Sequence, residues 1–158
     1  MSAFSQWLQG TGPEAEYSIM KHTVEQITHA GKLLAIIVPS GFQREGIEFF
    51  TLNEFSQQLA YMNRPAGYRI RAHLHNPVRR EVVFTQEVIF VRSGKVAVEF
   101  YSEEREYVGQ RIVASGDVVM LVSGGHGLKM LEPSEIIEVK QGPYTGDQDK
   151  ELFNGIGE

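Results

Sequence analysis

The chain contains no cysteine, which excludes disulfide bonds, thiolate metal sites and cysteine nucleophiles from its 158 residues. It also lacks any apolar run of 18 residues, so the sequence predicts no membrane-spanning helix. The first 17 residues lack the basic start and apolar stretch that are typical of a secretory signal. We therefore predict a cytoplasmic protein that does not bind membranes.

Positive charge is also scarce, because 15 lysines and arginines face 20 acidic residues and the net charge is −5. Nucleic-acid binding needs a basic surface, so we expect no nucleic-acid partner. A Gly-rich phosphate loop, a nucleophile elbow and a His-Glu-x-x-His motif are all missing, and nucleotide hydrolysis and serine-type acyl transfer are unsupported. The length fits a single domain with one hydrophobic core.

Short apolar segments rich in Val, Ile, Phe and Tyr make up most of the chain. They lie at residues 32–39, 46–52, 57–63, 68–75, 81–94, 95–104, 106–116, 117–125 and 134–142. This spacing is typical of an all-β sandwich or barrel. The sequences "RSGK" and "SEERE" predict hairpin turns, and "VSGGHG" predicts a Gly-rich loop.

Helix is expected to be rare. Residues 53–62 fit a helix, but their second half fits better as a strand that forms a hairpin through the Pro-Gly turn of "LAYMNRPAGYRI". Residues 14–30 remain unassigned. The segments "VVMLV" and "EVIFV" are apolar on both faces, which indicates a covering layer or a partner subunit. We therefore predict a homodimer.

The stretch "GYRIRAHLHN", at residues 67–76, places two of the five histidines one residue apart. In an extended strand, alternate side chains share a face, so His73 and His75 would lie beside Arg69 and Arg71. The opposite face would be apolar. Two imidazoles on one face can bind the same metal ion if neighbouring strands supply further ligands.

Two later residues extend this histidine pattern. Glu87 lies in an apolar run before Gly94, and His126 lies in the predicted Gly-rich loop. The full spacing is Gly67-x5-His73-x-His75-x11-Glu87-x6-Gly94, followed by Gly116-Asp117 and Gly124-Gly125-His126.

This pattern resembles the two sequence motifs of the cupin superfamily over about residues 67–130. The resemblance implies a jelly-roll β-barrel, which we place at residues 17–150. The two termini, an extension at residues 1–16 and a C-terminal tail at residues 151–158, are expected to be loosely structured. The resemblance also implies one divalent metal ion (Fe, Mn, Ni or Zn). Its ligands would be His73, His75, Glu87 and His126.

The chain departs from the cupin pattern at several positions. Eleven residues separate His75 from Glu87, where the family has three or four, so Glu81 remains a competing carboxylate. In the second motif, Val122 replaces the proline, Met130 replaces the asparagine, and a single residue separates Gly124 from the final histidine. We prefer Glu87 because its interval to Gly94 is kept and because a strand fixes ligand direction better than a loop.

The C-terminal sequence "IIEVKQGPYTGDQD" is similar to the cupin domain of bacterial mannose-6-phosphate isomerase and mannose-1-phosphate guanylyltransferase proteins. This likeness favours a role in sugar metabolism, including polysaccharide biosynthesis. Arg71, Arg69 and Tyr61 are the candidate substrate-binding residues, since a guanidinium holds a carboxylate or phosphate with two hydrogen bonds. Each of the three also fits a structural role, in an ion pair, at the surface or in the core.

Three functions remain open at this point. The first is a metal-dependent isomerase or epimerase, or a non-haem iron dioxygenase, that acts on a small polar or anionic metabolite. The second is a non-catalytic cupin that binds a sugar or another metabolite. The third is a jelly roll whose histidines bind nothing and which serves as an assembly partner. The fold alone does not decide among them, because jelly rolls host many unrelated activities.

Overall fold

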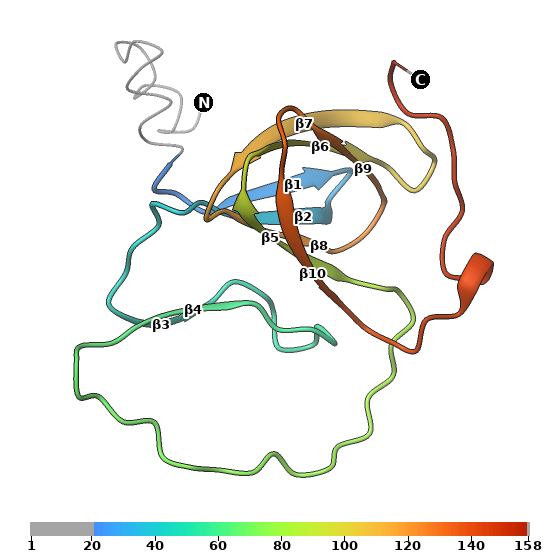
Figure 1. Ribbon diagram of the computed structural model, residues 1–158. Helices are drawn as coiled ribbons and strands as arrows, with labels where there is room; N and C mark the ends of the chain where they lie inside the picture. Colours follow the sequence, from blue (N-terminus) through green and yellow to red (C-terminus); the bar gives the residue numbers. More distant parts are fainter. Residues whose placement is uncertain (1–20, 158) are drawn as a thin grey trace, which may run out of the picture.

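The computed structural model describes residues 21–157, and these residues form an all-β fold with one short 3₁₀ helix (Figure 1). The strands are β1 (Glu25–His29), β2 (Lys32–Val38), β3 (Gly46–Phe49), β4 (Ala60–Asn63), β5 (Glu87–Ser93), β6 (Lys95–Tyr101), β7 (Tyr107–Ala114), β8 (Val118–Leu121), β9 (Gly125–Met130) and β10 (Glu135–Lys140), and the 3₁₀ helix is η1 (Gly146–Gln148). No helix within residues 21–157 is long and apolar enough to cross a bilayer. The predicted N-terminal extension at residues 1–16 lies outside the described residues.

Two antiparallel sheets face each other across the main core. The larger sheet has the strand order β1-β2-β8-β5-β10, and the smaller has the order β7-β6-β9. Because side chains alternate along a strand, one side of each sheet faces the partner sheet. Ile89 and Val119 of the larger sheet pack there against Val98 and Phe100 of the smaller sheet, and all four are fully buried. The predicted all-β class is confirmed.

A third layer covers the outer face of the larger sheet. The β3–β4 hairpin and the loops beside it place Phe50, Phe55 and Leu59 against Ile36 and Met120, which are fully buried. This explains why the segment "VVMLV" is apolar on both faces, since the same chain covers it. The "EVIFV" strand is covered less completely, and Phe90 remains exposed.

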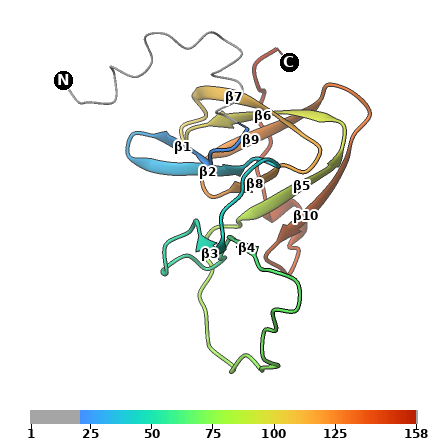
Figure 2. The same cartoon turned by 90° about the vertical axis from the view of Figure 1, so that its left-hand side faces the viewer.

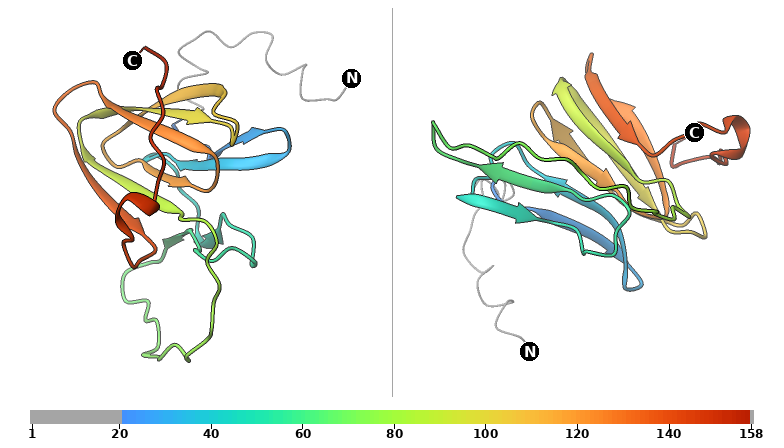
Figure 3. Two further views of the ribbon diagram at one scale, coloured as in Figure 1. Left: turned by 90° about the vertical axis from the view of Figure 1, so that its right-hand side faces the viewer. Right: turned by 90° about the horizontal axis from the view of Figure 1, so that it is seen from below.

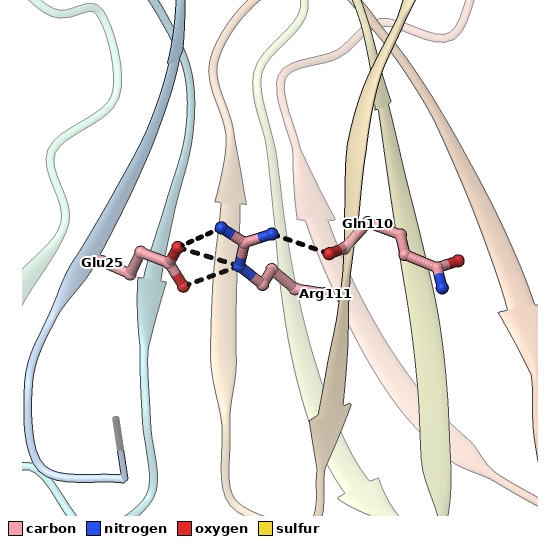
Figure 4. A network of polar contacts seen from close by, with 3 residues as sticks. All are labelled: Glu25, Gln110 and Arg111. Atoms are coloured by element: carbon pink, nitrogen blue, oxygen red, sulfur yellow. Dashed lines mark hydrogen bonds and ion pairs between the residues drawn. The ribbon is translucent and has the colours of Figure 1, made fainter. Parts of the chain in front are cut away.

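At one side of the sandwich an ion pair bridges the edge strands β1 and β7, and the other side is open. On the bridged side, the Arg111 guanidinium of β7 donates to both oxygens of the Glu25 carboxylate of β1, from Nη2 to Oε1 at 2.6 Å and from Nε to Oε2 at 3.1 Å (Figure 4). On the open side, β9 and β10 are edge strands, and no strand in the described part of the chain pairs with their outer edges. The sheets therefore do not close into a barrel.

Several turn predictions are corrected by the structure. "SEERE" joins the paired strands β6 and β7 as predicted, but "RSGK" is not a hairpin, because it carries the chain from one sheet to the other. β4 pairs with β3, not with residues after the Pro-Gly turn. The predicted loop around His126 is the strand β9. Each error concerns strand pairing, which depends on distant parts of the chain.

The predicted strand at residues 68–75 is also absent, since residues 64–86 contain no regular secondary structure. Residues 64–85, called the arm below, form a long loop that extends from the β3–β4 hairpin away from the smaller sheet (Figures 1 and 2). Every arm residue is exposed. Its large apolar side chains at positions 68, 70, 74, 78, 82, 83 and 84 therefore face solvent.

Candidate functional site

A cleft of about 850 Å³ opens on the side of the sandwich where β9 and β10 are unpaired. Its walls include residues of β9 and β10, the loop before β9, the end of the arm, and residues 141–153 of the chain after β10. Residues 141–157 are called the C-terminal segment. That segment crosses this side of the molecule (Figure 3, left). The polar side chains in the cleft include those of Glu87, His126, Glu138, Lys140 and Asp149.

Glu87 and His126 meet at this cleft because both belong to the inward-facing side of their strands. Glu87 begins β5 and has the same parity as the buried Ile89. His126 pairs in register with the buried Phe100 of β6, so its side chain lies on the core side of the smaller sheet. Glu87 Oε2 lies 3.2 Å from His126 Nε2, and the two side chains are 17% and 32% exposed.

Lys140 lies on the other side of the Glu87 carboxylate. It stands opposite Glu87 in the β10–β5 register, and its Nζ is 3.5 Å from Glu87 Oε1. The same ammonium lies 3.2 Å from Glu138 Oε1 and 3.9 Å from Asp149 Oδ2. The cleft therefore holds an imidazole, an ammonium and three carboxylates in one connected group.

The contacts within this group fix its charges. The hydrogen bond from His126 lowers the pKa of Glu87, and the nearby Lys140 acts in the same direction, although partial burial opposes both. The pKa of Lys140 is raised, first by its hydrogen bond to Glu138 and then by the charges of Glu138 and Glu87. At neutral pH the ionised Glu87 carboxylate therefore lies beside the Lys140 ammonium.

The spacing of Glu87 and His126 is compatible with two ligands of one metal ion. Two ligand atoms that each lie about 2.1 Å from an ion, in adjacent octahedral positions, are separated by about 3.0 Å. The observed separation of 3.2 Å is close to that value. Across residues 21–157, however, no three His, Asp or Glu side chains converge as a metal-binding group.

His73 and His75, the other two predicted ligands, lie on the exposed arm. Their rings make an edge-to-face contact with centroids 5.1 Å apart, and the Nδ1 of His73 donates a hydrogen bond of 2.8 Å to the carbonyl oxygen of Arg71. The structure thus forms two half-sites, one histidine pair on the arm and one Glu–His pair in the cleft. It does not bring the two half-sites together.

The remaining predicted site residues lie outside the cleft. Arg69 and Arg71 are exposed on the arm, as is Glu81, the alternative carboxylate. Tyr61 lies on β4, where its ring packs edge-to-face on Phe42 with centroids 5.0 Å apart. The structure therefore places Glu87, and not Glu81, beside His126.

Neither Lys140 nor the packing of the C-terminal segment was predicted from the sequence. The register that sets Lys140 opposite Glu87 involves strands more than 40 residues apart, so only the alternation of "EIIEVK" could have indicated that Glu138 and Lys140 share a face. Although predicted to be loosely structured, the end of the C-terminal segment packs the Phe153 ring on Tyr101, with centroids 5.1 Å apart. The Tyr101 hydroxyl also donates to Glu99 and accepts from the Ile156 amide.

Comparison of the chain with models of protein families, with curated proteins and with solved structures finds no match. The geometry of the cleft and the sequence pattern are therefore the grounds on which a function is proposed.

Proposed function

We propose that the protein is a small metal-dependent cupin that acts on a small anionic metabolite. In this proposal the two sheets are the main part of a jelly roll, and one divalent ion is bound by His73, His75, Glu87 and His126. The reaction would be an isomerisation or epimerisation of a sugar-related substrate. The observation that carries the proposal is the 3.2 Å approach of Glu87 Oε2 and His126 Nε2 at the cleft.

Three features of the chain support a metal ion at this position. Glu87 and His126 come from strands of different sheets, and both face the core side, as ligands in the interior of a sandwich must. Lys140, whose Nζ lies 3.5 Å from Glu87 Oε1, favours the ionised form of the Glu87 carboxylate, which is the form that binds a metal. His73 donates from Nδ1 to a backbone carbonyl, and this hydrogen bond fixes the tautomer whose Nε2 lone pair is available to a metal.

Three basic side chains of the proposed site suit an anionic substrate. The Lys140 ammonium lies at the cleft, and Arg69 and Arg71 share with the histidines the polar side of an extended 67–76 segment. When bound, a divalent ion supplies Lewis acidity toward a substrate carbonyl or hydroxyl. In this proposal Lys140 orients the substrate through its charge, and Arg71 binds the anionic group with two hydrogen bonds.

Metal content is compared between the wild type and single variants of the proposed ligands, with a variant of the alternative carboxylate Glu81 as the control. Protein purified without chelators should contain close to one divalent ion per chain. The variants Glu87→Gln, His126→Ala and His73→Ala should each lose most of it by elemental analysis. Glu81→Gln is the matched control and should retain it. Equal metal content in Glu87→Gln and Glu81→Gln, or substoichiometric metal in the wild type, would overturn the proposal.

The Lys140 contact favours a second candidate, a non-catalytic cupin that binds a metabolite. Lys140 already neutralises Glu87 from the Oε1 side, and with Glu138 and Asp149 it forms an ion-pair group that does not require a metal. If this candidate holds, sugar phosphates should bind and Lys140→Met should weaken their binding, with no turnover of any sugar phosphate. Measured turnover would exclude it, and oxygen consumption during that turnover would identify a dioxygenase in place of an isomerase.

A further inference from the structure

The arm has the side-chain pattern of a sheet strand but pairs with no strand. Between positions 67 and 76, Tyr68, Ile70 and Leu74 alternate with arginines and histidines. All of these side chains are exposed, and Leu74 reaches 94%. If residues 67–76 are extended, these apolar side chains lie along one side of the segment, and an exposed apolar row of this kind marks an interaction site.

The body of the protein offers an edge where such a strand fits. β9 is the edge of the smaller sheet, and no strand among residues 21–157 occupies its outer side. An unpaired edge presents a row of backbone donors and acceptors to an incoming strand. A strand added beside β9 would lie next to His126, whose side chain faces the cleft.

The charges of the arm and the cleft are complementary. Arg64, Arg69, Arg71, Arg79 and Arg80 give the arm five arginines, against Glu81 as its one acidic residue. The cleft contains the carboxylates of Glu87, Glu138, Asp149 and Glu151, with Lys140 and Lys150 as its basic residues. Opposite charges of this kind favour docking and fix its register.

At β9 the polar side of a docked arm would face the cleft, and its apolar side would face the outer side of the smaller sheet. If the histidines face the cleft, Tyr68, Ile70 and Leu74 face outward over the smaller sheet. The C-terminal segment packs on that outer face through Phe153 and Tyr101, and its Leu152 and Ile156 are exposed. The docked arm would thus bring exposed apolar side chains into contact with one another.

The arm of the same chain reaches the cleft only at its end, residues 82–85, and its residues 67–76 lie away from this edge (Figure 1). It begins at the β3–β4 hairpin, which covers the outer face of the larger sheet, whereas β9 belongs to the smaller sheet on the other side of the core. In two perpendicular views the arm extends from the β3–β4 hairpin in the direction away from the smaller sheet (Figures 1 and 2). An extended arm with this direction is suited to reach a second copy.

We infer that residues 67–76 of one chain add as a strand to β9 of a second copy, and that two copies exchange arms reciprocally. Each arm closes the open side of the other copy and brings His73 and His75 to the Glu87–His126 pair there. The evidence for the exchange is the unpaired edge of β9 and the exposed, unpaired residues 67–76. The role of the exchange in metal binding rests on the proposed function.

Engineered cysteines test the docking without any metal, and no native cysteine interferes. Lys129 of β9 faces outward, so Lys129→Cys is combined in turn with Tyr68→Cys, Ile70→Cys and Leu74→Cys. After oxidation, one combination should give a dimer on a non-reducing gel. A cross-link within one chain would show that the arm docks on its own body, and no cross-link in any combination would show that it does not reach β9. Either result overturns the inference.

A matched control places the second cysteine on the opposite edge of the same sheet. Ile112 of β7 is exposed and pairs in register with Ala97, on the outward side of β6. The combination of Ile112→Cys with Leu74→Cys should stay monomeric on the gel. An equal dimer yield from this control would mean collision between chains, not a specific edge.

Mixed chains test whether the metal site is shared between copies. His73→Ala/His75→Ala and Glu87→Gln/His126→Ala each destroy one half-site, and neither should bind Ni²⁺ in equilibrium dialysis. After the two are unfolded and refolded together, a mixed dimer has one intact site. Random pairing should therefore restore about a quarter of the wild-type Ni²⁺ per chain. No recovery, with wild-type binding intact, would overturn the shared site.

The two tests separate this inference from the proposed function. Intermolecular cross-links in a wild-type background that binds no Ni²⁺ would leave the arm exchange standing and remove the metal site. Ni²⁺ binding with cross-links only inside one chain would leave the metal site standing and remove the exchange. Circular dichroism of both double variants should match the wild type, which excludes misfolding as the cause of lost binding.

Discussion

The sandwich body and the arm follow the same sequence rules but reach opposite states. In β6, Val96, Val98 and Phe100 alternate with polar or small residues and are almost fully buried. In the arm, Tyr68, Ile70 and Leu74 alternate just as regularly and are exposed. The alternation of apolar and polar residues therefore identifies a segment that is able to form a strand. Whether the segment joins a sheet depends on the presence of a strand with a free edge.

The same contrast divides the candidate metal site. Glu87 and His126 are held by two packed strands, whereas His73 and His75 lie on the arm, which pairs with no strand of its own chain. A site made in two halves can be assembled or separated by docking of one strand. Metal binding and association of chains would then depend on each other, because each ligand that binds the assembled state favours it.

The largest contrast between the two regions is expected from core truncation. Phe100 is fully buried between the sheets, so Phe100→Ala should lower the free energy of unfolding by about 3–5 kcal/mol. Leu74→Ala should leave unfolding of the separated chain unchanged and weaken only the association of chains. Urea unfolding measured at low and high protein concentration checks both. A loss at low concentration from Leu74→Ala would mean that the arm belongs to the body.

A smaller contrast is expected from two glycines with positive φ. Gly94 turns the chain from one sheet to the other at φ 86°, and a Cβ there would collide with Ser134 and the carbonyl of Pro133. Gly94→Ala should therefore destabilise the protein by about 2 kcal/mol or more, from strain and overlap together.

Gly67 is the matched control, because it has φ 81° on the arm and a Cβ would meet nothing within 4 Å. Gly67→Ala should not change the thermal midpoint of the separated chain, since a solvent-exposed loop can relax. Equal losses in the two variants would indicate that backbone strain alone, and not contact with Ser134, sets the cost at Gly94.

The sequence predicts local features well and long-range pairings poorly. The alternation of residues 95–101, the turn at "SEERE" and the position of Glu87 on a strand all depend on neighbours in the chain, and the structure confirms them. The predictions that residues 57–63 pair across the Pro-Gly turn and that His126 lies in a loop were both wrong. β4 pairs with β3, and His126 lies on β9, because these pairings depend on distant parts of the chain. The sequence could not place Lys140, because its position depends on the β10–β5 register.

The smallest contrast concerns a hydrogen-bonded tyrosine and an exposed one. The Tyr101 hydroxyl lies 2.6 Å from Glu99 Oε2 and 3.0 Å from the Ile156 amide nitrogen, so it ties the C-terminal segment to β6. Tyr101→Phe should cost about 1 kcal/mol of stability and speed hydrogen exchange at the Ile156 amide. Tyr68→Phe, on the arm, should alter neither.

The ring of Tyr68 contacts the Arg64 guanidinium at 4.7 Å, and the phenylalanine ring would keep most of that attraction. The pair of variants thus removes one hydroxyl from each region and leaves each ring in place. If Tyr101→Phe matched Tyr68→Phe in both stability and exchange, the C-terminal segment would be as weakly attached as the arm. The outer face of β9 and β6 would then be accessible to the apolar side chains of a docked arm.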